Sequence, residues 1–113
     1  MPLQHAAIAA LTGDQACVAE QRRIYRERRD ILCGGLKRAG FDVIVPEASF
    51  YCLVAVPKGT TSLEYSGKIL ETAGVVVTPA TGFGAGGEGF VRLTLCADKS
   101  RLEEATARLA RMQ

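Results

Sequence analysis

The chain has little of several residue types that mark particular protein classes. Its 113 residues contain no tryptophan and one histidine, and aromatic residues make up only 6% of the total. No apolar run approaches the roughly 18–20 residues that a membrane-spanning helix needs, so we expect no transmembrane segment. The first residues also lack a basic stretch followed by an apolar core, so we expect no secretory signal.

An excess of charge of one sign is absent as well. Fourteen lysines and arginines face 12 acidic residues, a net charge of +2, which is too small to indicate a nucleic-acid partner by itself. Hydrophobic residues at 48% and charged residues at 23% are typical of a folded globular chain. We therefore expect a single domain over residues 1–113, with a helical lead-in and long helix at 1–40 and a small α+β unit at 41–113.

Metal and thiol chemistry lack their usual sequence spacing. Cys17, Cys33, Cys52 and Cys96 stand far apart without a CxxC pair, and His5 is the one histidine that could assist them. We expect no metal site and no catalytic triad built on histidine. The cysteines are interpreted as reduced and mostly buried thiols of a cytoplasmic protein.

Residues 1–40 carry helix signals. An alanine-rich helix is expected at 5–11, and a long helix from Asp14, a favourable N-cap residue, to Ala39 before Gly40. Apolar side chains of the long helix recur along one stripe, with a basic face opposite. The stripe comprises Val18, Ile24, Tyr25, Ile31, Leu32 and Leu36, and the basic face comprises Arg22, Arg23, Arg26, Arg28, Arg29, Lys37 and Arg38.

The basic face has two interpretations. Acidic residues are interleaved with it, so pairs such as Glu27 with Arg23 and Asp30 with Arg26 are expected at helical spacing. A solvated helix face is therefore favoured, and contact with nucleic-acid phosphates is the alternative.

Beyond Gly40 the apolar period predicts alternating strands and helices. Strands are expected at 41–45, 49–56, 75–77 and 90–96, where Pro46 and Pro79 close the first and third. A capping box of Thr61 and Glu64 opens a helix ending at Gly74, and a second box is expected at Ser100 and Glu103. The inner faces of these helices are expected to comprise Leu63, Ile69, Leu70 and Ala73 in the first, and Leu102, Ala105 and Leu109 in the second. This order predicts an α+β fold in two layers, with helices packed on one face of a small mixed sheet.

A glycine-rich loop at 82–87 matches the pattern GxGxxG. Dinucleotide binding requires a helix directly after such glycines, whereas here the next expected element is the strand beginning at Phe90. We therefore expect a loop whose glycines permit tight turns and the close approach of another group.

Arg92 is the most informative single residue. Strand alternation places it on the face opposite Val91 and Leu93, in the middle of an otherwise apolar strand. An unpaired buried charge is costly, and a guanidinium group suits a carboxylate or phosphate with two parallel bonds. A substrate anion and a structural position, either salt-bridged or at the sheet edge, are equally compatible with the sequence.

Four segments together resemble the C-terminal, small domain of class I/II aminotransferases, the pyridoxal-phosphate (PLP) enzymes of the aspartate aminotransferase fold. The segments are residues 25–32, 48–51, 74–84 and 87–95, in the family's order and spacing. Among subfamilies the chain is most similar to LL-diaminopimelate aminotransferases. One departure is Ala80, where the family usually has glycine after the proline, so the loop would shift if that position needed a positive φ.

The resemblance implies roles for three residues. Arg92 would grip the α-carboxylate of an amino acid or 2-oxo acid substrate, and Phe50 and Tyr51 would line the substrate side of the cleft. The residues that bind PLP in this family would precede residue 1, and none of the four lysines of the chain stands in a matching context. We therefore expect no cofactor bound to this chain alone and no transaminase activity. We also expect association into a homo-oligomer, because apolar surface on the first helix and the sheet would be exposed without the large domain. The alternative is a non-catalytic α+β binding or self-association module derived from that domain.

Overall fold

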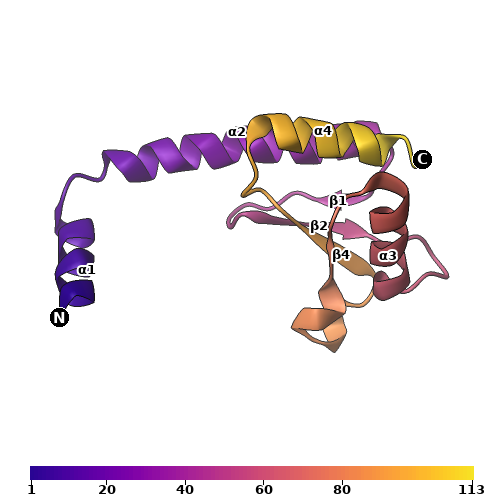
Figure 1. Ribbon diagram of the computed structural model, residues 1–113, viewed down its shortest axis with the longest axis horizontal. Helices are drawn as coiled ribbons and strands as arrows, with labels where there is room; N and C mark the ends of the chain where they lie inside the picture. Colours follow the sequence, from indigo (N-terminus) through magenta and orange to yellow (C-terminus); the bar gives the residue numbers. More distant parts are fainter.

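The sequence period changes after Gly40, from a helical stretch to alternating strands and helices. A computed structural model describes all 113 residues (Figure 1). The helices are α1 (Pro2–Thr12), α2 (Ala16–Arg38), α3 (Ser62–Ala73) and α4 (Lys99–Ala110). The strands are β1 (Val43–Ile44), β2 (Tyr51–Ala55), β3 (Thr78–Pro79) and β4 (Phe90–Thr94), and two short 3-10 helices, η1 (Ala80–Phe83) and η2 (Ala85–Gly87), precede β4. No helix combines the length and apolar character needed to cross a membrane.

The four strands form one sheet in the order β1-β2-β4-β3. Every neighbouring pair is antiparallel, with Leu53 opposite Arg92 and Thr78 opposite the other side of Arg92. The expected α+β class is confirmed. The expectation of a mixed sheet is wrong, because all strand pairs are antiparallel. The strand β4 enters between β2 and β3 and runs against both, so no parallel pair arises.

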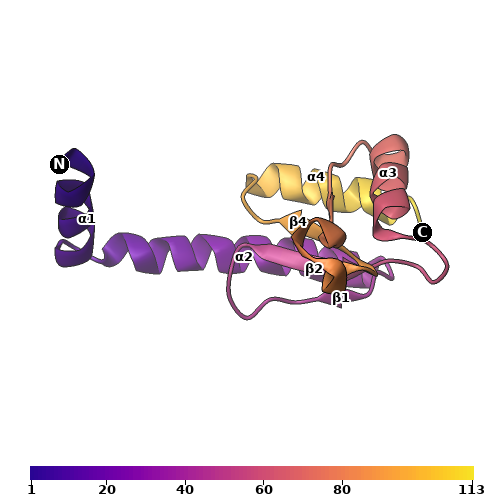
Figure 2. The same cartoon turned by 90° about the horizontal axis from the view of Figure 1, so that it is seen from below.

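One face of the sheet is covered and the other is open. Cys52, Val54, Val91 and Leu93 point to the covered face and are buried, while the alternate residues of β2 and β4 are partly or fully exposed. Helices α2 and α4 lie side by side over the covered face, with α3 packed next to α4 (Figures 1 and 2). The core cluster draws on α2, α3, α4 and the sheet, so the second half of α2 belongs to the same core as residues 41–113.

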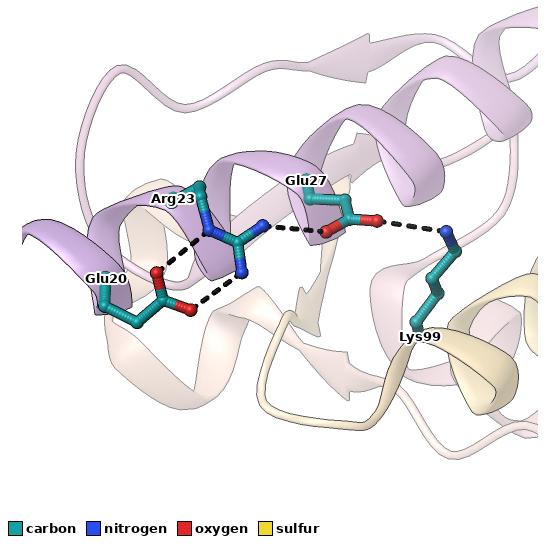
Figure 3. Close-up of polar contacts among 4 residues, drawn as sticks. All are labelled: Glu20, Arg23, Glu27 and Lys99. Atoms are coloured by element: carbon teal, nitrogen blue, oxygen red, sulfur yellow. Dashed lines mark hydrogen bonds and ion pairs between the residues drawn. The ribbon is translucent and has the colours of Figure 1, made fainter.

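The α2–α4 contact combines close packing with an ion network. A Cβ atom at Gly35 of α2 would collide with the side chain of Thr106 in α4, so glycine is required for this approach. At the exposed margin, Lys99 Nζ of α4 donates to Glu27 Oε1 of α2 at 3.0 Å (Figure 3). Arg23 joins this network, bonded to Glu20 at 2.7 Å and lying 3.7 Å from Glu27.

The expected helix ion pairs are half correct. Glu27 pairs with Arg23, as expected. Asp30 pairs with its neighbour Arg29 at 2.8 Å instead of with Arg26. The expected pairing with Arg26 is therefore wrong, because the Asp30 carboxylate is bonded to the Arg29 guanidinium.

Helix α1 and the first half of α2 extend away from the rest of the molecule (Figures 1 and 2). No residue of α1 is buried, and Val18 on the apolar stripe of α2 is 48% exposed. The buried residues of α2 are confined to positions 32–36. The stripe is therefore covered by the protein only in its second half.

The third strand lies later in the sequence than expected. Residues 75–77 are not in a strand, and β3 instead comprises Thr78 and Pro79, which pair with Arg92 and Val91. Proline is tolerated there because β3 is an edge strand, which needs no donor on its outer side. The expected strand at 75–77 is therefore wrong, although Val77 is buried in the core.

Helix α3 begins and ends as expected but rotates a different face inward. The capping box is confirmed, with Glu64 N donating to Thr61 Oγ1 at 3.2 Å and Thr61 N donating to Glu64 Oε2 at 2.9 Å. Gly74 closes the helix with a φ of 64°. The expected inner positions Leu63 and Leu70 are wrong, because they are 69% and 50% exposed. The inward face comprises Ser62, Tyr65, Ser66, Ile69 and Ala73.

Two helix starts also differ from expectation. Helix α2 has Gln15 at its N-cap position, while Asp14 accepts a hydrogen bond from Ala16 N at 3.0 Å. Helix α4 has Asp98 at its N-cap position, and its first turn is closed by Leu102 N donating to the Asp98 carbonyl. Ser100 therefore lies inside the first turn, and the expected box at Ser100 is wrong. The inner positions Leu102 and Leu109 of α4 are buried, as expected.

Candidate functional site

Arg92 lies on the open face of the sheet, opposite Val91 and Leu93, as strand alternation predicts. Its guanidinium carbon lies 4.0 Å from the centre of the Tyr51 ring and 3.8 Å from the centre of the Phe83 ring. Aromatic faces attract a cation electrostatically and also carry its apolar stem. The cation is therefore seated on two rings from separate elements, β2 and η1.

No carboxylate of the chain pairs with Arg92. The six ion pairs of the molecule involve other residues, and none of its side-chain hydrogen bonds is donated by the Arg92 guanidinium. Arg92 also stands on β4, which is paired on both sides, so it is not at a sheet edge. Within this chain, Arg92 is therefore neither salt-bridged nor at a sheet edge. The planar N–H groups remain free to bind an anion from outside the chain.

Phe50 and Tyr51 lie next to this arginine in different ways. Tyr51 contacts Arg92 directly, whereas Phe50 contacts the Tyr51 ring at 4.6 Å between centres and the Tyr25 ring at 6.0 Å. Ser49, just before them, has a φ of 72° and is the one non-glycine residue with a positive φ. This conformation is rare for a residue with a side chain, and such strain concentrates at functional sites.

Phe83 is a neighbour of Arg92 that was not singled out individually from the sequence. It lies in the glycine-rich loop and is 60% exposed, yet its ring carries the shortest cation contact of Arg92. A single aromatic residue among the glycines just before the arginine strand was the available signal.

The glycine-rich loop at 82–87 makes the tight turns and close approach that its glycines predict. Gly84 has a φ of 133°, and a Cβ atom at Gly87 would collide with the carbonyl of Ala80, so the loop closes tightly upon itself. The next regular element is the strand β4, in agreement with the rejection of a dinucleotide site. Ala80 is 4% exposed and does not have a positive φ, so alanine causes no backbone strain at this turn.

A groove lies beside this site. Its volume is about 640 Å³, and it runs between the first half of α2 and residues 46–50. Phe50 and Tyr25 line it, together with Arg22 and Arg26, which have no acidic partner. Arg92 does not line the groove, so the ring of Phe50 links two distinct features.

Other reactive groups lie apart from Arg92. The four lysines, Lys37, Lys58, Lys68 and Lys99, are all exposed. All four cysteines are free; Cys33 and Cys52 are buried, and Cys17 and Cys96 are exposed, so the expectation of mostly buried thiols holds for half of them. No group of three or more histidine, cysteine or acidic side chains is arranged to hold a metal ion.

The architecture is that of an aminotransferase small domain. An aromatic aminotransferase from Pyrococcus horikoshii superposes with a TM-score of 0.90 over 96% of this chain and 30% of its own, at 34% identity. A Thermus thermophilus aspartate aminotransferase variant superposes with a TM-score of 0.87 over 96% of this chain and 30% of its own, at 35% identity.

The sequence comparisons agree with the fold. The family model for aminotransferase class I and II matches residues 1–109, and the chain belongs to this family. An LL-diaminopimelate aminotransferase from Syntrophobacter fumaroxidans is 49% identical over 110 residues, and one from Moorella thermoacetica is 46% identical over 110 residues. Each alignment covers 97% of this chain but only 28% of the relative's length.

The side chains present do not fit the PLP cofactor that this family uses. A lysine that forms a Schiff base is normally desolvated or activated by a neighbouring cation. Each lysine here is exposed, and Lys99 is held by Glu27 at 3.0 Å. The chain thus offers an arginine suited to an anion without a lysine suited to the cofactor.

Proposed function

We propose that this chain is the substrate-carboxylate-binding C-terminal domain of a PLP-dependent amino acid aminotransferase and is inactive alone. The observation that carries the proposal is the seat of Arg92, whose guanidinium lies over the rings of Tyr51 and Phe83 with no carboxylate of the chain bound to it. The PLP lysine would be supplied by the part of the relatives' length that this chain does not span.

The site would work by orienting the substrate. Two N–H groups of Arg92 would donate to the two oxygens of an α-carboxylate, which defines both the position and the plane of that group. The Tyr51 and Phe83 rings would hold the guanidinium in place, and Phe50 would provide an apolar wall beside Tyr51. Such orientation lowers the entropic barrier of a reaction between bound groups.

The substrate class follows from the arginine and from the relatives. We assign the site to an amino acid and its 2-oxo acid partner, and we take LL-diaminopimelate as the first candidate because the named relatives are LL-diaminopimelate aminotransferases. A cytoplasmic location is supported by the four free thiols, which persist in a reducing compartment.

The proposal is tested by anion binding to the isotopically labelled chain. Titration with 2-oxoglutarate should shift the Arg92 Nε–H resonance in NMR spectra. Arg92→Lys keeps the charge but loses the planar fork, so the binding should weaken by about tenfold or more. Arg26→Lys, at an exposed arginine without an acidic partner, is the matched control and should bind as the parent chain does. An unshifted Arg92 resonance, or equal binding by Arg92→Lys, would refute the assigned role.

Inactivity alone is tested with the cofactor itself. Addition of PLP should produce no absorbance band of a specific lysine adduct and no amino-group transfer between an amino acid and 2-oxoglutarate. A stoichiometric adduct mapped to one lysine, accompanied by turnover, would contradict the assignment of the PLP lysine to another part of the protein.

A second candidate function is self-association without catalysis. Met1, just before α1, and Leu3, Ile8 and Leu11 within it expose 58–84% of their surface, and no residue of this 11-residue helix is buried. Isolated helices of this length are marginal in water, so a covering surface would stabilise α1. Light scattering over a range of concentrations separates the candidates: a dimer would support association, and a constant monomer mass would reject it.

A further inference from the structure

The carboxylate of Glu88 bonds to a segment 26 residues earlier in the chain. It accepts hydrogen bonds from Ser62 N at 2.8 Å and from Ser62 Oγ at 3.2 Å, and a third from Gly89 N at 3.0 Å. Ser62 is the first residue of α3 and is fully buried. These bonds, that from Ser62 N above all, hold the pKa of Glu88 below its ordinary value, so the carboxylate stays charged at neutral pH.

The same serine also contacts the beginning of the glycine-rich loop. Thr81 Oγ1 lies 3.3 Å from Ser62 Oγ, and Thr81 stands two residues before Phe83 in η1. Both ends of the segment 80–89 are therefore hydrogen-bonded to the buried Ser62, through Thr81 near the start and Glu88 near the end. The close approach of Gly87 to the Ala80 carbonyl ties the two ends to each other.

Phe83 lies at the middle of this fastened segment. It is 60% exposed, so packing holds it weakly, yet its ring centre lies 3.8 Å from the Arg92 guanidinium carbon. The position of the ring must therefore come from the backbone of the loop that carries it.

We propose that Glu88 is a positioning residue, which holds the loop 80–89 against the N-terminus of α3 and thereby keeps Phe83 on the Arg92 guanidinium. This inference rests on the proposed function for its meaning, since it is Arg92 that would grip the substrate carboxylate. Glu88 itself does not contact Arg92 or the substrate. Its effect passes through Ser62, Thr81 and the intervening loop.

A simpler role for Glu88 would be to cap α3. That helix already has a cap of its own, because Glu64 accepts from Thr61 N and Thr61 Oγ1, both at 2.9 Å, and Thr61 Oγ1 accepts from Glu64 N. Glu64 and Glu88 thus serve the same helix end, but only Glu88 belongs to the loop that carries Phe83. This difference makes Glu64 a matched control.

The experiment measures the Arg92 side-chain resonances of the labelled chain without ligand. The ring currents of Tyr51 and Phe83 should displace the Arg92 Hδ and Hε protons upfield. Glu88→Ala should reduce this displacement and should speed hydrogen exchange of the Ser62 amide by roughly tenfold or more, because a charge-assisted bond is lost. Glu64→Ala should instead speed exchange of the Thr61 amide and leave the Arg92 shifts in place.

If Glu88→Ala unfolds α3, two further variants still test the proposal. Thr81→Val removes the second fastening without touching the backbone of α3, and should also reduce the Arg92 displacement. Glu88→Gln retains an oxygen acceptor for Ser62 N, so most of the upfield displacement of the Arg92 protons should remain in this variant. Unchanged Arg92 shifts in both Glu88→Ala and Thr81→Val, or equal loss in Glu64→Ala, would overturn the proposal.

Failure of this inference can be told apart from failure of the proposed function. The ring-current displacement is measured without a carboxylate, so it reports only the position of Phe83. The 2-oxoglutarate titration reports only the role of Arg92. Intact anion binding with unchanged Arg92 shifts in the loop variants would reject the role of Glu88 alone.

Discussion

The ring of Phe83 lies under the Arg92 guanidinium at 3.8 Å, although the two residues belong to different elements, η1 and β4. This contact brings an exposed aromatic residue of a glycine-rich loop to the one arginine of the open sheet face. The pairing of β3 with β4 brings the start of η1 close to β4, because η1 begins directly after β3. The contact can be tested by substitution of either partner.

Phe83→Leu should weaken the seat of Arg92 while keeping the residue apolar. A cation–π contact at a half-exposed site contributes about 0.5–2 kcal/mol, so the free energy of unfolding should fall by an amount in that range. A double-mutant cycle with Arg92→Gln in urea unfolding isolates the pair. Phe50→Leu, whose ring contacts Tyr51 instead of Arg92, should show no coupling to Arg92. A coupling energy near zero for Phe83 would contradict the contact.

Gly35→Ala should destabilise the protein although alanine is the better helix former. The added Cβ would collide with the Thr106 side chain, and overpacking of this kind costs about 1–3 kcal/mol. Gly34→Ala is the matched control, because its Cβ would meet only the flexible end of Arg38 at 3.4 Å. That variant should gain about 0.5–1 kcal/mol from helix propensity. Thermal unfolding of both should therefore give shifts of opposite sign.

Stability should fall at acid pH because of two carboxylates at the N-terminus of α3. Hydrogen bonds from the Thr61 backbone lower the pKa of Glu64, and bonds from the Ser62 backbone lower that of Glu88, both from an ordinary 4.5. A carboxylate with a lowered folded-state pKa contributes stability above the unfolded-state pKa and loses it as the pH falls through the folded-state value. The urea midpoint should therefore decrease below about pH 4.5.

The two carboxylates can be identified by substitution. A variant carrying Glu64→Gln and Glu88→Gln should be less stable at neutral pH and should show a flatter pH dependence between about pH 7 and about pH 3. Glu20 and Glu27 also have lowered pKa values, through the side chains of Arg23 and Lys99 respectively, so some acid dependence should remain. An unchanged pH profile in the double variant would show that these bonds are not formed in solution.

The four thiols should fall into two kinetic classes. Cys17 and Cys96 are exposed, whereas Cys33 and Cys52 are each 2% exposed in the core between α2 and β2. A hydrogen bond with Cys33, together with burial, raises the pKa of Cys52, so this thiol should stay protonated and unreactive. Titration with a disulfide reagent should modify two thiols rapidly and the other two only in denaturant. Cys17→Ser should leave one rapid thiol, and four rapid thiols would show that the core is open.

Local patterns were sufficient for much of the framework. The capping box at Thr61 and the helix end at Gly74 were predicted because each involves residues only a few positions apart. The alternation in β4 likewise placed Arg92 on the face opposite Val91, since side chains in any strand alternate. The membership of the aminotransferase family was also evident from ordered motifs, and the comparisons confirm it.

Patterns failed where the answer depended on a distant partner. Helix α3 has apolar residues on two sides, and only its packing against the sheet and α4 selects Tyr65 and Ile69 over Leu63 and Leu70. The apolar residues 75–77 have strand propensity, but the register with β4 places the pairing at Thr78 and Pro79. Propensity is a weak preference that such pairing readily overrides.

The amino-acid sequence alone determined the family, the α+β class, the face on which Arg92 stands, and the capping of α3, because these depend on neighbours along the chain. Only the tertiary structure decided that Phe83 and Tyr51 both lie at Arg92, that no acidic residue reaches its guanidinium, and that Glu88 bonds to Ser62. These relationships join segments separated by many residues. They arise when antiparallel pairing of β2, β3 and β4 brings loop, strand and helix end together, and this pairing depends on residues far apart in the sequence.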